Sequence, residues 1–333
     1  MRAGEPPLAG TARSARQAAA GGTPSAADSA DWSRAPERGN ALALRLMSWI
    51  ALACGRHVAR WVLHPVTLYF LLAAGGPRRH SRRYLGRVLG RPAGWRDLYC
   101  HFHVFASTIL DRVYLLGGRS DLFEISVHGE ALIDATLAEG RGAFLVGAHL
   151  GSFEALHAVG RDRTGLRIAM VMYQGNARLI SAALRAIAPG HRAEIIALGR
   201  VDSMLAIRDW LDGGGLAGLL ADRALPGESQ RATSLRLSFL GREAEFSDGP
   251  FRLAALLRRR VIFMAGLYGG GARYDVRFEL LADFSDRISD PAERERRIRE
   301  AVEAYAARLE AWCREWPYNW FNFHDFWHED TAS

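Results

Sequence analysis

The stretch GAFLVGAHLGSFEAL, residues 142–156, changes from a continuous apolar run to a helical pattern across a turn. Strands that are buried on both faces of a parallel sheet have such continuous apolar runs. Gly147 and Gly151 permit a tight turn between the strand and the helix. The stretch therefore predicts one strand–turn–helix unit.

From Asp121 onward, short apolar runs alternate with helical patterns. This alternation predicts an α/β fold whose mainly parallel central sheet is flanked by helices. The predicted strands are residues 143–146, 168–173, 194–198, 216–220, 235–240, 261–267 and 274–280, and the predicted helices are 153–159, 177–187, 201–211 and 251–259.

The last helix has the clearest start signal. Asp290 is suited to cap it, Pro291 fits its first turn, and Glu293 resembles the acidic member of a capping box. After it comes the aromatic segment PYNWFNFHDFW, residues 317–327. Such a segment suits either a rim that faces a membrane or a packed lid over the core.

The N-terminal third predicts helices that associate with a membrane. Residues 1–30 are rich in Ala, Gly, Ser and Pro and predict a disordered tail without a secretory signal, so we expect the chain to stay in the cytoplasm. We expect residues 31–120 to form an amphipathic, arginine-rich helical lead-in and residues 121–330 to form the α/β domain.

Two apolar segments of the lead-in, residues 46–54 and 61–74, are flanked by arginines and contain aromatic residues. Their arginines and histidines favour helices in the lipid headgroup region over a spanning helix. A pair of core helices is the alternative. Residues 95–116 also show helical apolar spacing.

The net charge of +7 is concentrated in one part of the chain. Residues 41–119 contain twelve arginines and two aspartates, a balance of +10. This excess suits an anionic membrane lipid or an acidic carrier protein. We expect no nucleic-acid partner, because the basic stretch is interleaved with apolar segments and contains no reader motif.

All 43 basic residues are arginine. The absence of lysine excludes a P-loop, a Schiff base and pyridoxal chemistry in their usual forms. Cys54, Cys100 and Cys313 form no C-x-x-C pair, which argues against structural zinc and a disulfide framework. Glu154 and His157 make a single E-x-x-H motif without a second one, so we expect no metal and no cofactor.

His149 and Glu154 are candidate catalytic residues at the carboxyl end of a predicted strand, where α/β proteins collect functional groups. Residues five apart diverge by roughly 140° on a helix, so the two can pair only if His149 precedes the helix. A carboxylate on Nδ1 would leave Nε2 as the acceptor that a general base needs. The spacing alone is a weak signal among eleven histidines.

Several longer motifs strengthen this interpretation. They are AHLGSFE (148–154), ADRALPGES (221–229), FLGREAEFSDGPFRLA (239–254) and the aromatic end. With them, residues 32–327 resemble the lysophospholipid acyltransferase superfamily, and more closely its lipid A lauroyl/myristoyl acyltransferase branch. Within it, the sequence is most similar to predicted acyltransferases beside ornithine-lipid, aryl polyene or flexirubin type pathways.

The resemblance implies that His149 is the general base and that Glu154 orients it. An acyl carrier protein, or CoA, would donate the chain from its thioester to a hydroxyl or amine of a lipid-like acceptor. The resemblance also implies a peripheral or monotopic place on the cytoplasmic face of a bacterial inner membrane.

Four further residues are candidate substrate-binding groups. Asp222 and Arg223 stand where the lipid A branch has an Asp-Gln-Asp strand end, and Arg223 departs from that pattern. Arg223 could hold a phosphate or carboxylate, or stabilise an oxyanion. The alternative is a structural ion pair between Arg223 and Asp222. Ser247 and Gly249 precede a helix whose backbone N–H groups could bind an anion. The superfamily's Pro-Glu-Gly-Thr block is not recognisable, which puts its phosphate-binding roles in doubt here.

Two other functions remain open. An acyl hydrolase or thioesterase would use the same histidine to activate water, although no G-x-S-x-G elbow supports a serine hydrolase. A non-catalytic module that binds lipid or a carrier protein is the third possibility.

Overall fold

The structure is a computed structural model that describes residues 37–161, 166–173, 194–199, 201–223 and 234–329. The chain divides into two units, Met1–Leu44 and Arg45–Ser333. Of the first unit, only residues 37–44 are described, and they are helical. The predicted tail at 1–30 and the predicted helix at 177–187 lie outside the described residues. The central sheet and all of the predicted site residues belong to the second unit.

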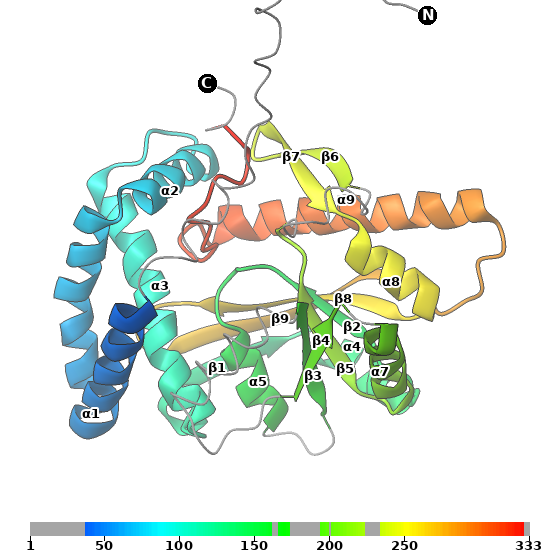
Figure 1. Ribbon diagram of the computed structural model, residues 1–333, viewed down its shortest axis with the longest axis horizontal. Coiled ribbons are helices and arrows are strands. Elements are labelled where there is room, and N and C mark those ends of the chain that lie inside the picture. Colours follow the sequence, from blue (N-terminus) through cyan, green and yellow to red (C-terminus); the bar gives the residue numbers. More distant parts are fainter. Residues whose placement is uncertain (1–36, 162–165, 174–193, 200, 224–233, 330–333) are drawn as a thin grey trace, which may run out of the picture. The chain divides into compact units, whose positions relative to one another are not determined.

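A seven-stranded sheet forms the centre of this unit, in the order β1-β9-β8-β2-β5-β3-β4 (Figure 1). All neighbouring strands are parallel except β8 and β9. The prediction of an α/β fold with a mainly parallel sheet is therefore confirmed. The strands are β1 (Glu124–His128), β2 (Phe144–Gly147), β3 (Ile168–Tyr173), β4 (Glu194–Leu198), β5 (Leu216–Leu220), β8 (Arg260–Tyr268) and β9 (Arg273–Asp283).

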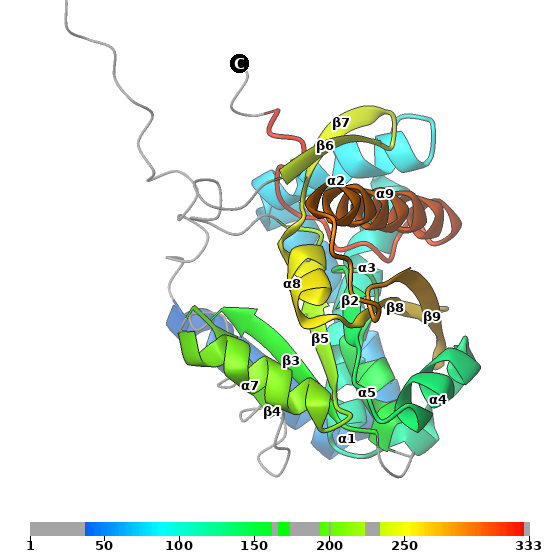
Figure 2. The same ribbon diagram turned by 90° about the vertical axis from the view of Figure 1, so that its right-hand side faces the viewer.

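Helices cover both faces of the sheet. Alternate residues of β2 belong to different cores: Phe144 packs in a cluster with residues of α9, whereas Leu145 packs in a cluster with residues of α5. Figure 2 shows α8 near α9 and places α7 with β3 and β4. These helices are α4 (Glu130–Ala138), α5 (Phe153–Arg161), α7 (Val201–Asp212), α8 (Gly249–Leu257) and α9 (Pro291–Glu315).

The predicted strand at 235–240 is not part of the central sheet, which corrects one expectation. It is β6 (Ser234–Phe239), which pairs antiparallel with β7 (Arg242–Ser247) in a separate two-stranded sheet. The turn between them has positive φ at both central residues, Leu240 and Gly241, as a tight hairpin requires. Adjacent strands joined by two residues can only be antiparallel.

Three helices precede the sheet: α1 (Glu37–Ala73), α2 (Gly75–Val88) and α3 (Trp95–Leu116). Apart from Ala74, the two predicted apolar segments lie in α1, on either side of Gly55, whose φ of 79° and ψ of 167° interrupt the helix. Buried residues of these helices, including Leu71, Tyr84 and Leu98, belong to the same core as β2.

Within the described ranges, no single helix combines the length and apolarity that crossing a bilayer requires. The pair Ala53–Ala73 and Gly75–Val88 meets the requirement together, with a bend of 95° between its members.

Asp290 caps α9 by accepting from the Ala292 N–H at 3.0 Å, as predicted.

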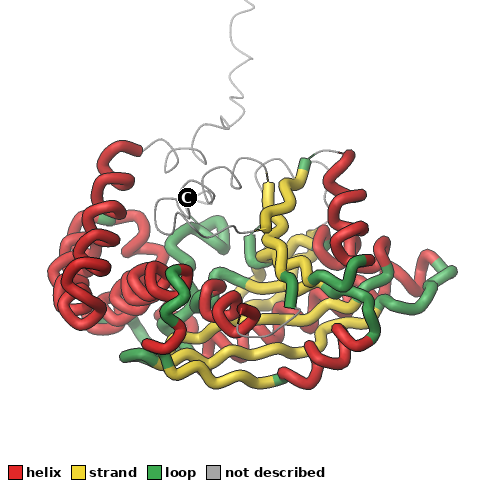
Figure 3. The backbone as a smooth tube through the Cα atoms, turned by 90° about the horizontal axis from the view of Figure 1, so that it is seen from below, coloured by secondary structure: helices red, strands yellow, loops and turns green. Residues whose placement is uncertain are grey.

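The C-terminal aromatic segment is packed, which favours the lid over the membrane rim. Beyond the helix, Trp320 is fully buried and Phe321 and Phe326 are 6% exposed. Figure 3 shows this end of the chain as loop.

Candidate active site

The turn after β2 presents His149 and is fixed from two sides. Ser152 N–H donates to the Gly266 carbonyl of β8 at 2.7 Å, and Gly151 N–H donates to the Asn319 carbonyl at 2.9 Å. Gly151 has a φ of +75°, and a Cβ there would lie 2.0 Å from the Gly266 oxygen. Only glycine fits this close approach.

His149 is held by Asp222, which follows the neighbouring strand β5. The Nδ1 of His149 lies 2.9 Å from Oδ1 of Asp222, and its backbone N–H donates to Oδ2 at 2.9 Å. Trp320 Nε1–H also donates to Oδ2, at 2.9 Å. Because β2 and β5 are parallel neighbours, their carboxyl ends bring residues 73 positions apart into contact.

The charge state of Asp222 fixes the tautomer of His149. Burial alone would raise the pKa of the Asp222 carboxyl, but the charge and hydrogen bond of His149, then Arg223 and Trp320, hold that pKa well below its usual value. An ionised carboxylate can only accept, so Nδ1 must donate. In the neutral form of the imidazole, Nε2 then carries the lone pair, on a side chain that is 31% exposed.

Glu154 is not the partner of His149, which corrects the predicted pairing. In the first turn of α5, its Oε1 lies 2.7 Å from Arg112 Nε, and its Oε2 accepts from Ser152 Oγ at 3.1 Å. His149 precedes the helix as expected, but the carboxylate within reach of its Nδ1 comes from the end of β5. Glu154 is instead a buried anion that links α5 to α3.

Among the described residues, Arg223 does not form the structural ion pair with Asp222 that was one of its predicted roles. Asp222 makes its ion pair with His149. The Nε of Arg223 is buried without a hydrogen-bond partner among the described residues, and burial lowers the pKa of its guanidinium. The Nε–H donor of Arg223 is therefore unused, while its charge acts on the neighbouring Asp222.

Ser247 and Gly249 do not join the His149 site. Ser247 Oγ accepts from the Gly249 N–H at 3.3 Å, and no hydrogen bond or ion pair links either residue to His149 or Asp222 in the described ranges. The start of α8 already contains a carboxylate, that of Asp248, which is 2% exposed and accepts from Arg252 Nε at 2.8 Å. A second anion there would meet like charge.

Two histidines of α3 face different sides. His101 is fully buried, with Nδ1 2.8 Å from Ser81 Oγ and Nε2 2.9 Å from the Trp320 carbonyl. Burial lowers its pKa to about 4. His103 stacks on His64 with ring centroids 4.7 Å apart. Within the part of the chain that is described, no three His, Cys, Asp or Glu side chains are arranged to hold a metal ion.

Trp320 is the site residue that the sequence does not single out. It lies among eleven residues rich in aromatics, and nothing local marks it as the one that contacts Asp222. Its fully buried ring packs edge-on against Tyr84 and Phe239.

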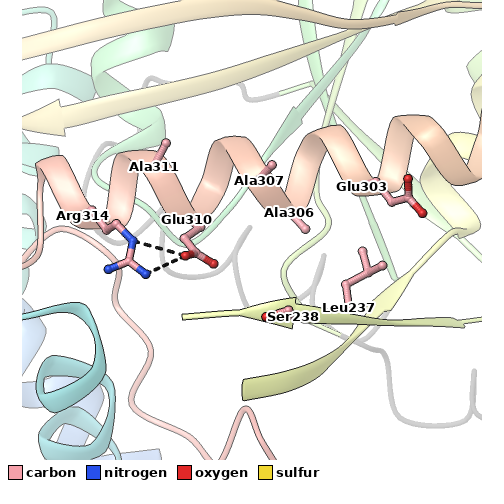
Figure 4. Close-up of a pocket in the computed structure, with 8 residues that line it drawn as sticks. All are labelled: Leu237, Ser238, Glu303, Ala306, Ala307, Glu310, Ala311 and Arg314. Atoms are coloured by element: carbon pink, nitrogen blue, oxygen red, sulfur yellow. Dashed lines mark hydrogen bonds and ion pairs between the residues drawn. The ribbon is translucent and has the colours of Figure 1, made fainter. Parts of the chain in front are cut away.

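A cavity of 570 Å³ lies elsewhere, between β6 and α9 (Figure 4). Its walls include Leu237 and Ser238 of β6, and Glu310 and Arg314 of α9, which form an ion pair across 2.7 Å. Neither His149 nor Asp222 lines it, so the cavity is separate from the candidate active site.

Comparison with known proteins does not identify the chain. No protein-family model matches it, and no curated protein matches it.

Proposed function

We propose that this protein transfers an acyl chain from a thioester, on an acyl carrier protein or CoA, to a hydroxyl or amine of a lipid-like acceptor. The observation that carries the proposal is the 2.9 Å contact between His149 Nδ1 and Asp222, which leaves Nε2 as a proton acceptor at the carboxyl end of β2. His149 and Asp222 form the catalytic dyad in this proposal.

The reaction needs no covalent enzyme intermediate. Nε2 of His149 removes the proton of the acceptor group while that oxygen or nitrogen attacks the thioester carbonyl. The tetrahedral intermediate then collapses, the carbon–sulfur bond breaks, and the imidazolium returns the proton to the departing thiolate. Asp222 stabilises the imidazolium that exists between the two steps.

The resemblance to lipid A acyltransferases supports the lipid class of the acceptor and the carrier-protein donor. We propose that α1 rests on the cytoplasmic face of a bacterial inner membrane. Its side chains Trp61, Tyr69 and Leu72 are 76%, 65% and 60% exposed, although they are large and apolar. Arg78 of α2 supplies positive charge near this helix and lies 5.5 Å from the Trp95 ring.

The test is a product analysis with the full chain. Purified protein is incubated with a bacterial lipid extract and with acyl carrier protein or CoA that carries a radiolabelled acyl chain. The labelled products are then separated. We expect label in a lipid, with loss of at least about 100-fold in His149→Ala. His128→Ala, which removes an exposed histidine of β1, is the matched control and should retain activity.

Other outcomes decide between the alternatives. Label that appears only as free fatty acid would identify a hydrolase. Binding of lipid or carrier protein by both His149→Ala and wild type, with no turnover by either, would identify a binding module.

A further inference from the structure

Three polar side chains near the dyad have buried atoms that lack hydrogen-bond partners among the described residues. These atoms are Nε of Arg223, both amide atoms of Asn322 and Nδ1 of His324. Asn322 is only 1% exposed. Buried polar atoms without partners are rare in folded proteins, and a group of them requires an explanation.

The backbone brings the two segments that carry these side chains next to His149. Arg223 follows Asp222 directly in the chain. On the other side, Phe321 N–H donates to the His149 carbonyl at 2.8 Å, and Trp320 reaches Asp222. The segment that contains Asn322 and His324 thus begins in contact with the dyad.

The first two phenylalanine rings of this segment face α3. Phe321 and Phe323 both pack against Phe105 of α3, with ring centroids 5.1 and 5.2 Å away. His324 lies toward the dyad instead, because the charges of Arg223, Asp222 and His149 act on its pKa. Asn322 lies between the two phenylalanines in the chain, and its N–H donates to the Trp320 carbonyl at 2.8 Å.

The charges in this group favour an anion. Burial, followed by the charge of Arg223, lowers the pKa of His324 to about 4, so its imidazole is neutral near pH 7. The oxygens of Asp222 are occupied by His149 and Trp320. The Arg223 guanidinium, which stays protonated, therefore adds a positive charge and an unused Nε–H donor.

We propose that Arg223, Asn322 and His324 bind an oxyanion, a carboxylate or phosphate, that belongs to the acceptor of the acyl chain. This inference rests on the proposed function, and it narrows the acceptor to a lipid with an anionic group close to its reacting hydroxyl or amine. The pantetheine arm holds the donor's phosphate far from the thioester, so a phosphate beside His149 would keep the thioester out of reach.

Calorimetric titration of the full chain tests this assignment without any turnover. Octyl phosphate and octanoate carry the anion, octanol is the neutral match, and 4′-phosphopantetheine represents the donor. We expect the two anionic amphiphiles to bind at least about tenfold more tightly than octanol. Arg223→Gln should abolish this preference, and Arg242→Gln, which removes an exposed arginine of β7, should keep it.

A second variant separates binding from folding. Because neither amide atom of Asn322 has a partner among the described residues, Asn322→Leu should fold, raise the melting temperature and weaken binding of the anionic amphiphiles. Equal affinity for octyl phosphate and octanol in the wild type would overturn the proposal. An Arg223-dependent preference for 4′-phosphopantetheine alone would move the site to the donor and also overturn it. Neither outcome depends on whether acyl transfer occurs, so failure of the proposed function remains distinguishable.

Discussion

The substitution Asp222→Asn changes the dyad with almost no change in volume. The carboxylate accepts three hydrogen bonds, from the backbone and Nδ1 of His149 and from Trp320. An amide has one oxygen, which can replace Oδ2 and keep the two bonds made there. Its NH2 group then faces Nδ1 and must donate to it.

This reversal forces the His149 proton onto Nε2 and removes the base. General base catalysis contributes about 10²–10⁴-fold, so we expect acyl transfer to fall by that factor, equivalent to roughly 3–5 kcal/mol of transition-state stabilisation. Each of the two retained hydrogen bonds loses its charge assistance, about 1 kcal/mol. The free energy of unfolding should therefore fall by only about 2 kcal/mol.

Three measurements check this prediction. Urea unfolding gives the stability, acyl transfer under single-turnover conditions gives the rate, and ¹⁵N spectra of histidine-labelled protein give the tautomer, with His149→Ala assigning the signal. Asp209→Asn, an exposed control, should leave all three unchanged. A variant that folds and keeps more than about a tenth of the wild-type rate would refute the role of Asp222.

The same substitution has a pH signature in stability. The pKa of Asp222 is lowered by folding, so the stability that its carboxylate contributes is present above about pH 4 and is lost as the pH falls further. The stability difference between wild type and Asp222→Asn should narrow below about pH 4. A difference that stays constant down to about pH 2 would show that the carboxylate is not stabilised in this way.

Three other predictions concern the surroundings of the dyad. Gly151→Ala should abolish activity and lower the melting temperature, because its Cβ would collide with the Gly266 carbonyl. Gly241→Ala, at a similar φ but in open space, should lower the free energy of unfolding by only about 1–2 kcal/mol. Equal losses of stability in thermal melts of the two variants would contradict this. Folding lowers the pKa of His101, so the stability that its neutral imidazole contributes to the fold is present above about pH 6.5 and is lost as the pH falls toward 4. His101→Gln should therefore remove part of the acid sensitivity of the free energy of unfolding, on the order of 3 kcal/mol in denaturant titrations. A pH profile of stability that is unchanged in this variant would contradict the prediction. Trp320→Phe removes one of three bonds to Asp222 and should reduce the acyl-transfer rate less than Asp222→Asn does; a larger loss, measured in the same assay, would contradict that order.

The parts of the fold that the sequence predicts well are its buried parallel strands. The predicted bounds 168–173 and 216–220 coincide with β3 and β5, which lie inside the sheet and are largely buried, because strands covered on both faces must be apolar throughout. The bounds 194–198 also coincide with β4, although it is an edge strand with exposed and half-buried residues. The strand β1 is not predicted: it lies at the edge of the sheet, and its exposed and half-buried residues alternate over only five positions. The hairpin of β6 and β7 is likewise missed, since Leu240 gives no signal for a turn with positive φ.

The candidate site shows the same limit. The position of His149 at a strand end follows from local pattern and glycine placement. Its contact with Asp222 depends on β5 lying next to β2, which is a property of strand order across 73 residues of separation. Glu154 is closer in sequence, but Arg112 of α3 takes its carboxylate, and no local pattern reveals that.

The most direct test of the central claim is the single-turnover rate of acyl transfer by His149→Ala, with folding verified and His128→Ala as control. We predict that the wild type and the control form labelled lipid at similar rates, while His149→Ala falls by at least about 100-fold. Acyl transfer by His149→Ala at the wild-type rate would contradict the assignment of His149 as the base.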